Sequence, residues 1–108
     1  MSYSEILANR IRAQLKFFPE EFTEKRMFSG LSFLFQGKMT VGIVKDDLAV
    51  RIIDAKMETE LANKYVRPMD FTKRPMKEFV YVSPEGFKSE EQLLHYIELG
   101  LEHAKSKL

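Results

Sequence analysis

The chain has 108 residues, of which 44% are hydrophobic and 31% are charged, as is usual for one globular domain. Its 17 basic and 16 acidic side chains leave a formal net charge of +1, without the basic excess of most nucleic-acid-binding domains. There is no cysteine, which excludes disulfides, thiolate metal ligands and a cysteine nucleophile. With no signal-peptide pattern and no apolar run long enough to span a bilayer, we expect a single cytoplasmic domain over residues 1–108.

The N-terminal segment predicts an amphipathic helix over residues 4–17. Ser2 and Glu5 have the spacing of a capping box. Apolar residues then recur every three or four positions and form one stripe: Leu7, Ile11, Leu15 and Phe18. Pro19 is expected to end the helix.

Residues 27–53 change to a period of two, which indicates strands. Side chains alternate in three segments, at 31–36, 39–44 and 48–53, and the breaks between them contain the turn residues Gly37-Lys38 and Asp46-Asp47. The pattern predicts a three-stranded antiparallel meander. Six of its side chains are expected to face the core: Phe33, Phe35, Val41, Ile43, Val50 and Ile52.

The C-terminal half predicts a second helix over residues 55–65 capped by Asp54, a strand over 78–82, a turn over 83–86 and a helix over 90–106. Ser89 and Gln92 form a capping box for the last helix. Its buried edge is expected to contain Leu94, Ile97, Leu101, Ala104 and Leu108. With a short strand at 69–72, the order is α-β-β-β-α-β-β-α, which predicts a two-layer α+β domain with the helices on one face of an antiparallel sheet.

The tripeptide Arg-Pro-Met occurs twice, at residues 67–69 and 74–76. A proline fixes its own φ, lacks an amide donor and holds the preceding residue extended, so Pro68 and Pro75 are expected at strand starts or on a sheet edge. A stiff edge that blocks further strand pairing is one explanation of the repeat. The other is a binding role, in which Arg67, Arg74 and Lys77 frame an anion or an acidic partner surface.

Arg51 is the third candidate arginine, on the sheet face opposite the expected core. Its neighbours on that face are small and predict a shallow trough: Ser32, Thr40, Gly42 and Ala49. The face is either simply solvated or binds a partner or anion at Arg51. The candidate partner- or anion-binding residues are therefore Arg51, Arg67, Arg74 and Lys77, and their separation in sequence leaves open whether they converge.

We find no pattern typical of a catalytic or metal site. His95 and His103 are eight residues apart on one predicted helix, whereas two zinc ligands on a helix usually lie four apart. We therefore expect two exposed histidines. Asp46-Asp47 is explained by its turn. The sequence predicts no enzyme, no cofactor and no metal.

Two stretches followed by the terminal helix resemble the TfoX N-terminal domain family: KRMFSGLSFLFQGKMTVGIVKDDLAVRI and RPMDFTKRPMKEFVYVSPEGF. The resemblance covers roughly residues 5–106 and implies a two-layer α+β fold like that of the type III secretion chaperones. Full-length members regulate natural competence genes and carry a further C-terminal helical domain, so the competence role is not transferred. Ser29 replaces a glycine usual in the family, which leaves Gly30 as the turn position that needs a glycine.

From these patterns we expect a non-enzymatic regulatory or protein-interaction module that binds a protein partner or a second copy of itself, and no membrane. Two alternatives remain open. One is nucleic-acid binding through Arg51, Arg67 and Arg74, and the other is binding of a small anionic metabolite by the same cations.

Overall fold

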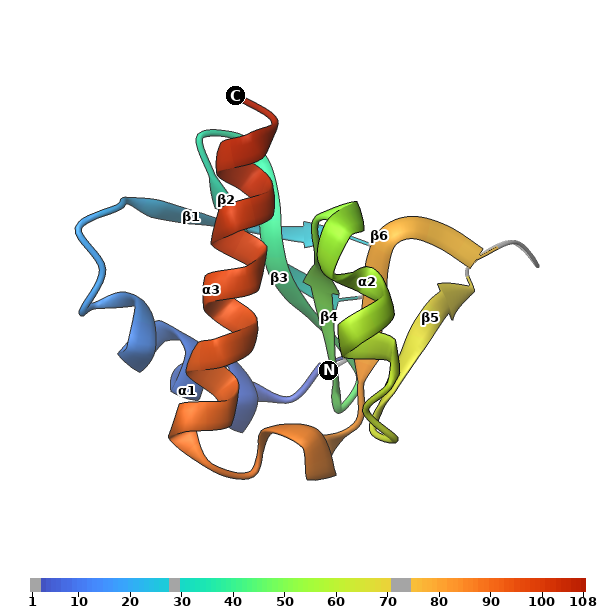
Figure 1. The fold of residues 1–108 in the computed structure, drawn as a ribbon. Coiled ribbons are helices and arrows are strands. Elements are labelled where there is room, and N and C mark those ends of the chain that lie inside the picture. Colours follow the sequence, from blue (N-terminus) through green and yellow to red (C-terminus); the bar gives the residue numbers. More distant parts are fainter. Residues whose placement is uncertain (1–2, 28–29, 71–74) are drawn as a thin grey trace.

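The computed structural model describes residues 3–27, 30–70 and 75–108 (Figure 1). In chain order these residues form α1 (Glu5–Leu15), β1 (Phe22–Met27), β2 (Gly30–Phe35), β3 (Lys38–Val44), β4 (Asp47–Arg51), α2 (Asp54–Leu61), β5 (Val66–Asp70), β6 (Pro75–Val82), the 3-10 helix η1 (Pro84–Phe87) and α3 (Glu90–Ser106). No helix among them is long and apolar enough to cross a membrane.

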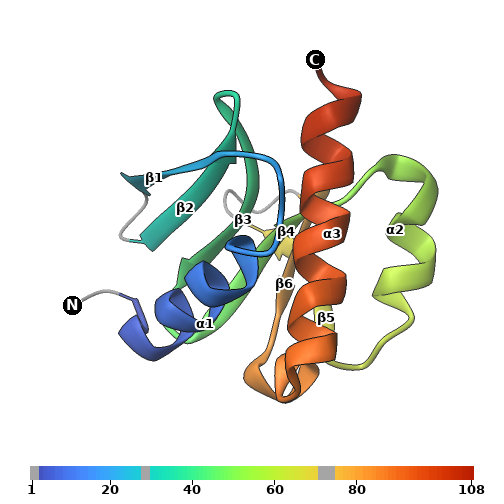
Figure 2. The same ribbon diagram turned by 90° about the vertical axis from the view of Figure 1, so that its left-hand side faces the viewer.

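The strands form one antiparallel sheet in the order β1-β2-β3-β4-β6-β5, and the three helices pack on one of its faces (Figures 1 and 2). This confirms the two-layer α+β architecture. The sheet contains one strand, β1, that the sequence pattern does not predict. β1 lies on an edge of the sheet, and its residues 23–26 are exposed. A strand that is exposed on both faces does not show the period-two apolar pattern from which strands are predicted.

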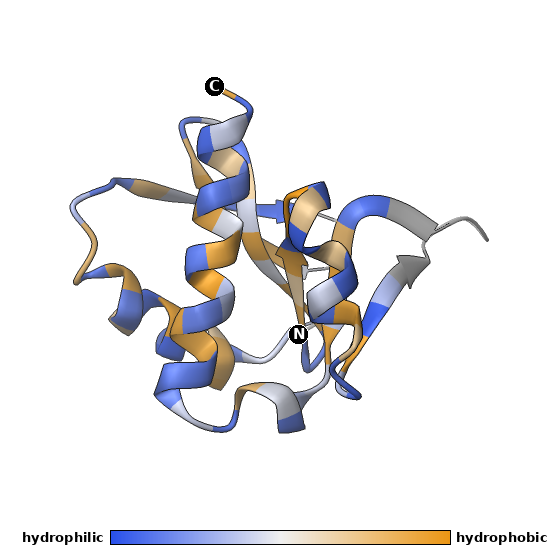
Figure 3. Ribbon diagram, in the orientation of Figure 1, coloured by the Kyte–Doolittle hydropathy of each residue, from blue (hydrophilic) through white to orange (hydrophobic). Residues whose placement is uncertain are grey.

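The core lies between the helices and the inner face of the sheet, where side chains of five strands meet α1 and α3. All six side chains expected there are buried. Figure 3 shows the same division, with apolar residues on the central strands and polar residues along the outer sides of the helices. Each large apolar side chain that is removed from water contributes about 1.5–3 kcal/mol, so this layer supplies most of the stability.

The buried edge of helix α3 is confirmed in part. Ile97, Leu101 and Ala104 are buried as expected, whereas Leu94 is only partly buried and Leu108 is exposed. Leu93 and Tyr96 are buried instead. The helix comes closest at Gly100, where an added Cβ would lie 2.4 Å from the carbonyl oxygen of Thr40. A glycine at this position therefore allows α3 to lie against the backbone of β3.

The helix caps differ in part from the expectation. Ser4 rather than Ser2 caps α1, since its hydroxyl accepts a hydrogen bond from the Leu7 amide at 3.2 Å. Asp54 lies inside α2, whose N-cap is Ile53, and this helix ends at Leu61 instead of residue 65. The capping box of α3, Ser89 with Gln92, is confirmed.

Proline and glycine take structural positions around the sheet. Pro68 lies in edge strand β5, where the pairing with β6 shifts register before Asp70, and Pro75 is the first residue of β6. β5 begins at Val66, three residues before the expected strand. Gly30 begins β2 opposite Met27, and a Cβ there would lie 2.1 Å from the Ile43 carbonyl oxygen. Close approach of the β3 backbone is therefore a reason for glycine at this position.

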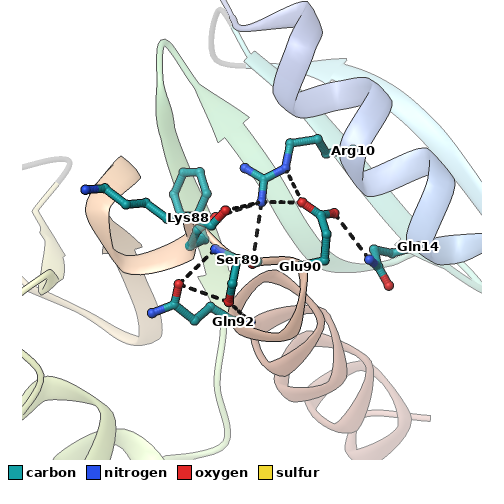
Figure 4. A network of polar contacts seen from close by, with 7 residues as sticks. Arg10, Gln14, Lys88, Ser89, Glu90 and Gln92 are labelled. Carbon is teal, nitrogen blue, oxygen red and sulfur yellow. Dashed lines mark hydrogen bonds and ion pairs between the residues drawn. The ribbon is translucent and has the colours of Figure 1, made fainter.

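Arg10 joins α1 to the start of α3 (Figure 4). Its guanidinium donates hydrogen bonds to the Phe87 carbonyl and to the Glu90 carboxylate, both at 2.8 Å, and Gln14 donates to the second Glu90 oxygen at 3.3 Å. A carboxylate at the N-terminus of a helix is also favoured by the helix dipole. The network therefore fixes the position of α1 relative to α3.

We expect Arg10→Ala to lower the free energy of unfolding by about 1.5–3 kcal/mol, because it removes charge-assisted hydrogen bonds from a largely shielded side chain. Arg12→Ala is the matched control, since the Arg12 side chain is 35% exposed against 26% for Arg10, and its hydrogen bonds in the described structure go to the side chains of Glu24 and Asn9. The Arg12 pair should contribute about 0–1 kcal/mol. Urea unfolding followed by circular dichroism measures both. Equal losses would contradict a special role for the Arg10 network.

Candidate functional site

The outer face of the sheet, which the described helices leave uncovered, has an apolar cluster of its own. Ala49 and Phe79 are buried in it, with Met39 and Tyr81 packed against them. Cross-strand pairing places Ala49 beside Tyr81, Arg51 beside Phe79 and Arg67 beside Tyr81. We call this set the outer-face cluster: Met39, Ala49, Arg51, Arg67, Phe79 and Tyr81.

The shallow trough expected around Arg51 is filled. Ser32 and Ala49 are only 4% and 1% exposed. The methyl group of Met39 lies 2.9 Å from where a Cβ on Gly42 would be, so Met39 covers the small residues. Thr40 is not on this face as expected, because the β2–β3 register shifts between Phe33 and Leu34; it is fully buried and donates a hydrogen bond to the Phe33 carbonyl at 2.8 Å.

Arg67 is held within the chain. Its guanidinium lies 5.0 Å from the centre of the Tyr81 ring, donates to the Ser83 hydroxyl at 3.1 Å and forms an ion pair with Asp47. Asp47 therefore does more than form a turn, because it compensates the charge of Arg67. The arrangement leaves a stacked arginine–tyrosine pair with little net charge on this part of the outer face.

Arg51 is placed differently. Its guanidinium lies 4.8 Å from the centre of the Phe79 ring, and its Nη2 lies 3.4 Å from His103 Nε2. Among the carboxylates whose side chains the structure describes, none comes within ion-pair distance of it. Burial lowers the pKa of Arg51, and the negative charge of Glu78 opposes that shift only in part. Arg51 is thus a partly buried cation beside an aromatic ring, with no anionic partner in the described part of the chain.

His103 connects Arg51 to α3, and the expectation that it would be exposed is wrong. The residue is 4% exposed, its Nε2 lies 3.4 Å from Glu78 Oε1, and its Nδ1 has no hydrogen-bond partner in the described structure. Burial, together with the charge of Arg51, lowers the pKa of His103, while Glu78 raises it. His103 lies three residues after Gly100 and seven after Tyr96, so it is on the buried side of α3. This helical spacing is the sequence pattern from which its burial could have been predicted.

Glu78 of β6 contacts the groups around His103. It has a positive φ of 59°, uncommon for a residue other than glycine, asparagine or aspartate. Its carboxylate accepts a hydrogen bond from the Asp54 amide at 3.2 Å and pairs with Lys107 at 3.1 Å, and the hydrogen bond with Lys107 lowers the pKa of Glu78. The unusual backbone turns this carboxylate toward the C-terminal turns of α3.

The comparison with known families decides the classification of the chain. Residues 13–104 match the family model of the TfoX N-terminal domain. The chain belongs to the TfoX N-terminal domain family. Membership supports a regulatory domain of the TfoX type. Searches of curated proteins and of solved structures found no match.

The matched range of this TfoX N-terminal domain includes all four candidate cations, and three of them lie among the described residues. Arg51 and Arg67 lie on the same face, on either side of β6, and Lys77 is exposed on β6 itself. Arg74 lies outside the described residues. The sequence does not predict that Arg51 and Arg67 lie over the rings of Phe79 and Tyr81. It also does not predict that His103 and Glu78 lie near Arg51.

His103 should make the TfoX N-terminal domain less stable in mild acid. Its pKa is lowered in the folded state, so its contribution is present above the usual histidine value of about 6.5 and is lost as the pH falls through the folded pKa. We expect the melting temperature to fall between about pH 7 and about pH 5, and to fall less in His103→Gln. His95→Gln, at an exposed position of the same helix, should behave like the wild type. Identical profiles for His103→Gln and the wild type would contradict this assignment.

Proposed function

We propose that this TfoX N-terminal domain is a cytoplasmic regulatory module that acts by binding a partner protein, without catalysis, and that the partner docks on the outer-face cluster. Arginine and tyrosine are the residue types enriched at the energetic centres of protein interfaces. The cluster has both on a face that the described helices leave uncovered, next to an apolar methionine.

The environment of Arg51 is the observation that carries the proposal. A desolvated guanidinium is unfavourable unless an anion or several acceptors compensate it. Among the side chains that the structure describes, its polar contact is with the His103 ring at 3.4 Å, which is a poor substitute for a carboxylate. A docking partner that brings an acceptor to Arg51 would supply the missing interaction.

The charge distribution favours a protein partner over nucleic acid. The domain has a net charge of +1, and Asp47 already compensates Arg67. Binding along a phosphate backbone usually needs several uncompensated cations in a row. The outer-face cluster instead combines one such cation with apolar and aromatic surface, as the centres of protein interfaces do.

Site-specific photocrosslinking in cells that express the domain tests the proposal. A benzophenone amino acid replaces Tyr81 in one variant and Glu91, on the exposed side of α3, in the control. We expect one adduct of defined mass from position 81 only, and its loss when Arg51→Gln is added. No adduct from position 81, the same adduct from both positions, or an adduct unaffected by Arg51→Gln would refute docking at this face.

A further inference from the structure

We infer that Arg51 binds a carboxylate of an acidic partner segment with apolar flanking residues, and that this binding is coupled to uptake of a proton by His103. The inference rests on the proposed function, and specifies the chemistry of the partner and how pH regulates its docking.

Charge complementarity identifies the occupant as acidic. Arg51 lacks an ion-pair partner among the described residues, and Lys77 adds an exposed positive charge on β6, while the Arg67–Asp47 pair is neutral. A second copy of the chain in a two-fold contact would bring two such positive faces together and be repelled. A carboxylate, in contrast, can accept two parallel hydrogen bonds from one guanidinium.

The surroundings of Arg51 define what should flank the carboxylate. Phe79 lies under the guanidinium, and Met39 and Tyr81 pack beside it as the partly exposed members of the cluster. Apolar side chains on either side of the acidic residue would cover Met39 and Tyr81. By excluding water, they would also strengthen the ion pair at Arg51.

The coupling follows from the position of the His103 ring. The charged groups that act on it are Arg51 from β4, Glu78 from β6 and Lys107, which directly follows its own helix. Arg51 Nη2 and Glu78 Oε1 lie at the same distance of 3.4 Å from Nε2, so their opposite effects on the imidazolium compete. The Glu78 carboxylate is thus already in place to stabilise a protonated ring.

A carboxylate bound to Arg51 changes this competition. It offsets the positive charge that disfavours the imidazolium and leaves Glu78 to favour it. The pKa of His103 therefore rises on binding, and the complex takes up a proton. By linkage, the partner binds more tightly as the pH falls, and a protonated His103 prefers the occupied site by the same factor.

The experiment uses the full chain and two peptide arrays as probes. One array contains capped hexapeptides with a central glutamate flanked by varied apolar residues, and the matched array has glutamine in its place. We expect binding to glutamate peptides only, lost in Arg51→Gln. For the best binder, isothermal titration should show affinity at least about threefold higher at about pH 6 than at about pH 8, in line with a modest coupling.

Two measurements assign the coupling to His103. The NMR titration of the His103 ring should shift to higher pH when saturating peptide is present, and this needs no variant. His103→Gln should bind with little pH dependence, whereas His95→Gln should retain it. Absence of glutamate-peptide binding, equal binding of glutamine peptides, equal affinity at both pH values, or an unshifted His103 titration would overturn the inference. A position-81 adduct with a partner that contacts Arg51 without a carboxylate would overturn it and leave the proposed function intact.

Discussion

Gly100→Ala is expected to destabilise the domain by about 2 kcal/mol, although alanine is favoured over glycine by about 1 kcal/mol in an exposed helix. The added methyl group would lie 2.4 Å from the Thr40 carbonyl oxygen and 2.6 Å from its carbon. These are backbone atoms of a central strand, so rotation of a side chain cannot relieve the overlap. Either α3 moves away from β3 or the strand distorts, and both loosen a close-packed layer.

Thermal and urea unfolding followed by circular dichroism measure this effect. Glu98→Ala, on the exposed side of α3, is the control and should change the stability by no more than about 0.5 kcal/mol. Adding Thr40→Ser should not rescue Gly100→Ala, because the overlap involves the carbonyl group of residue 40. A neutral or stabilising Gly100→Ala would show that α3 does not lie this close to β3.

Phe33→Ala should have the largest effect of any single truncation considered for this domain, about 3–5 kcal/mol. Phe33 of β2 is fully buried on the inner face and is paired across the sheet with Val41 of β3. Its removal leaves a cavity that the surrounding strands and α3 can only partly fill. Since domains are usually stable by about 5–15 kcal/mol, the variant is expected to be partly unfolded near physiological temperature.

Phe17→Ala is the matched control for Phe33→Ala, since Phe17 is 87% exposed after the end of α1. It should leave the midpoint of unfolding almost unchanged. The chain has no tryptophan, so circular dichroism is again the suitable probe. Similar losses for both phenylalanines would contradict the position of the core between the inner face and the helices.

The binding proposal and the stability predictions concern opposite faces of the sheet. Gly100 and Phe33 fix the inner layer, whereas Arg51, Phe79 and Tyr81 lie on the outer face. In the described part of the chain, His103 and Glu78 connect the two faces near the end of β4. Variants of the outer-face cluster can therefore be tested for docking with limited risk of unfolding the domain, provided that their melting temperatures are compared.

The sequence alone determined the features that repeat locally along the chain. Alternation in residues 31–53 identified three strands and their buried side chains, and Ser89 with Gln92 identified the start of α3. These signals are local because a side chain's face follows from the backbone period of its own element. The family resemblance, based on the stretches of residues 25–52 and 67–87, agrees with the match over residues 13–104.

Only the tertiary structure decided which side chains meet. The sheet order β4-β6-β5 places Arg67 within reach of Asp47, and the end of β4 places Arg51 beside His103, although both pairs are distant in sequence. A register shift buries Thr40, and edge strand β1 has no apolar alternation to reveal it. Strand order, register shifts and helix approach depend on packing between distant segments, and a periodic pattern within one segment contains no information about them.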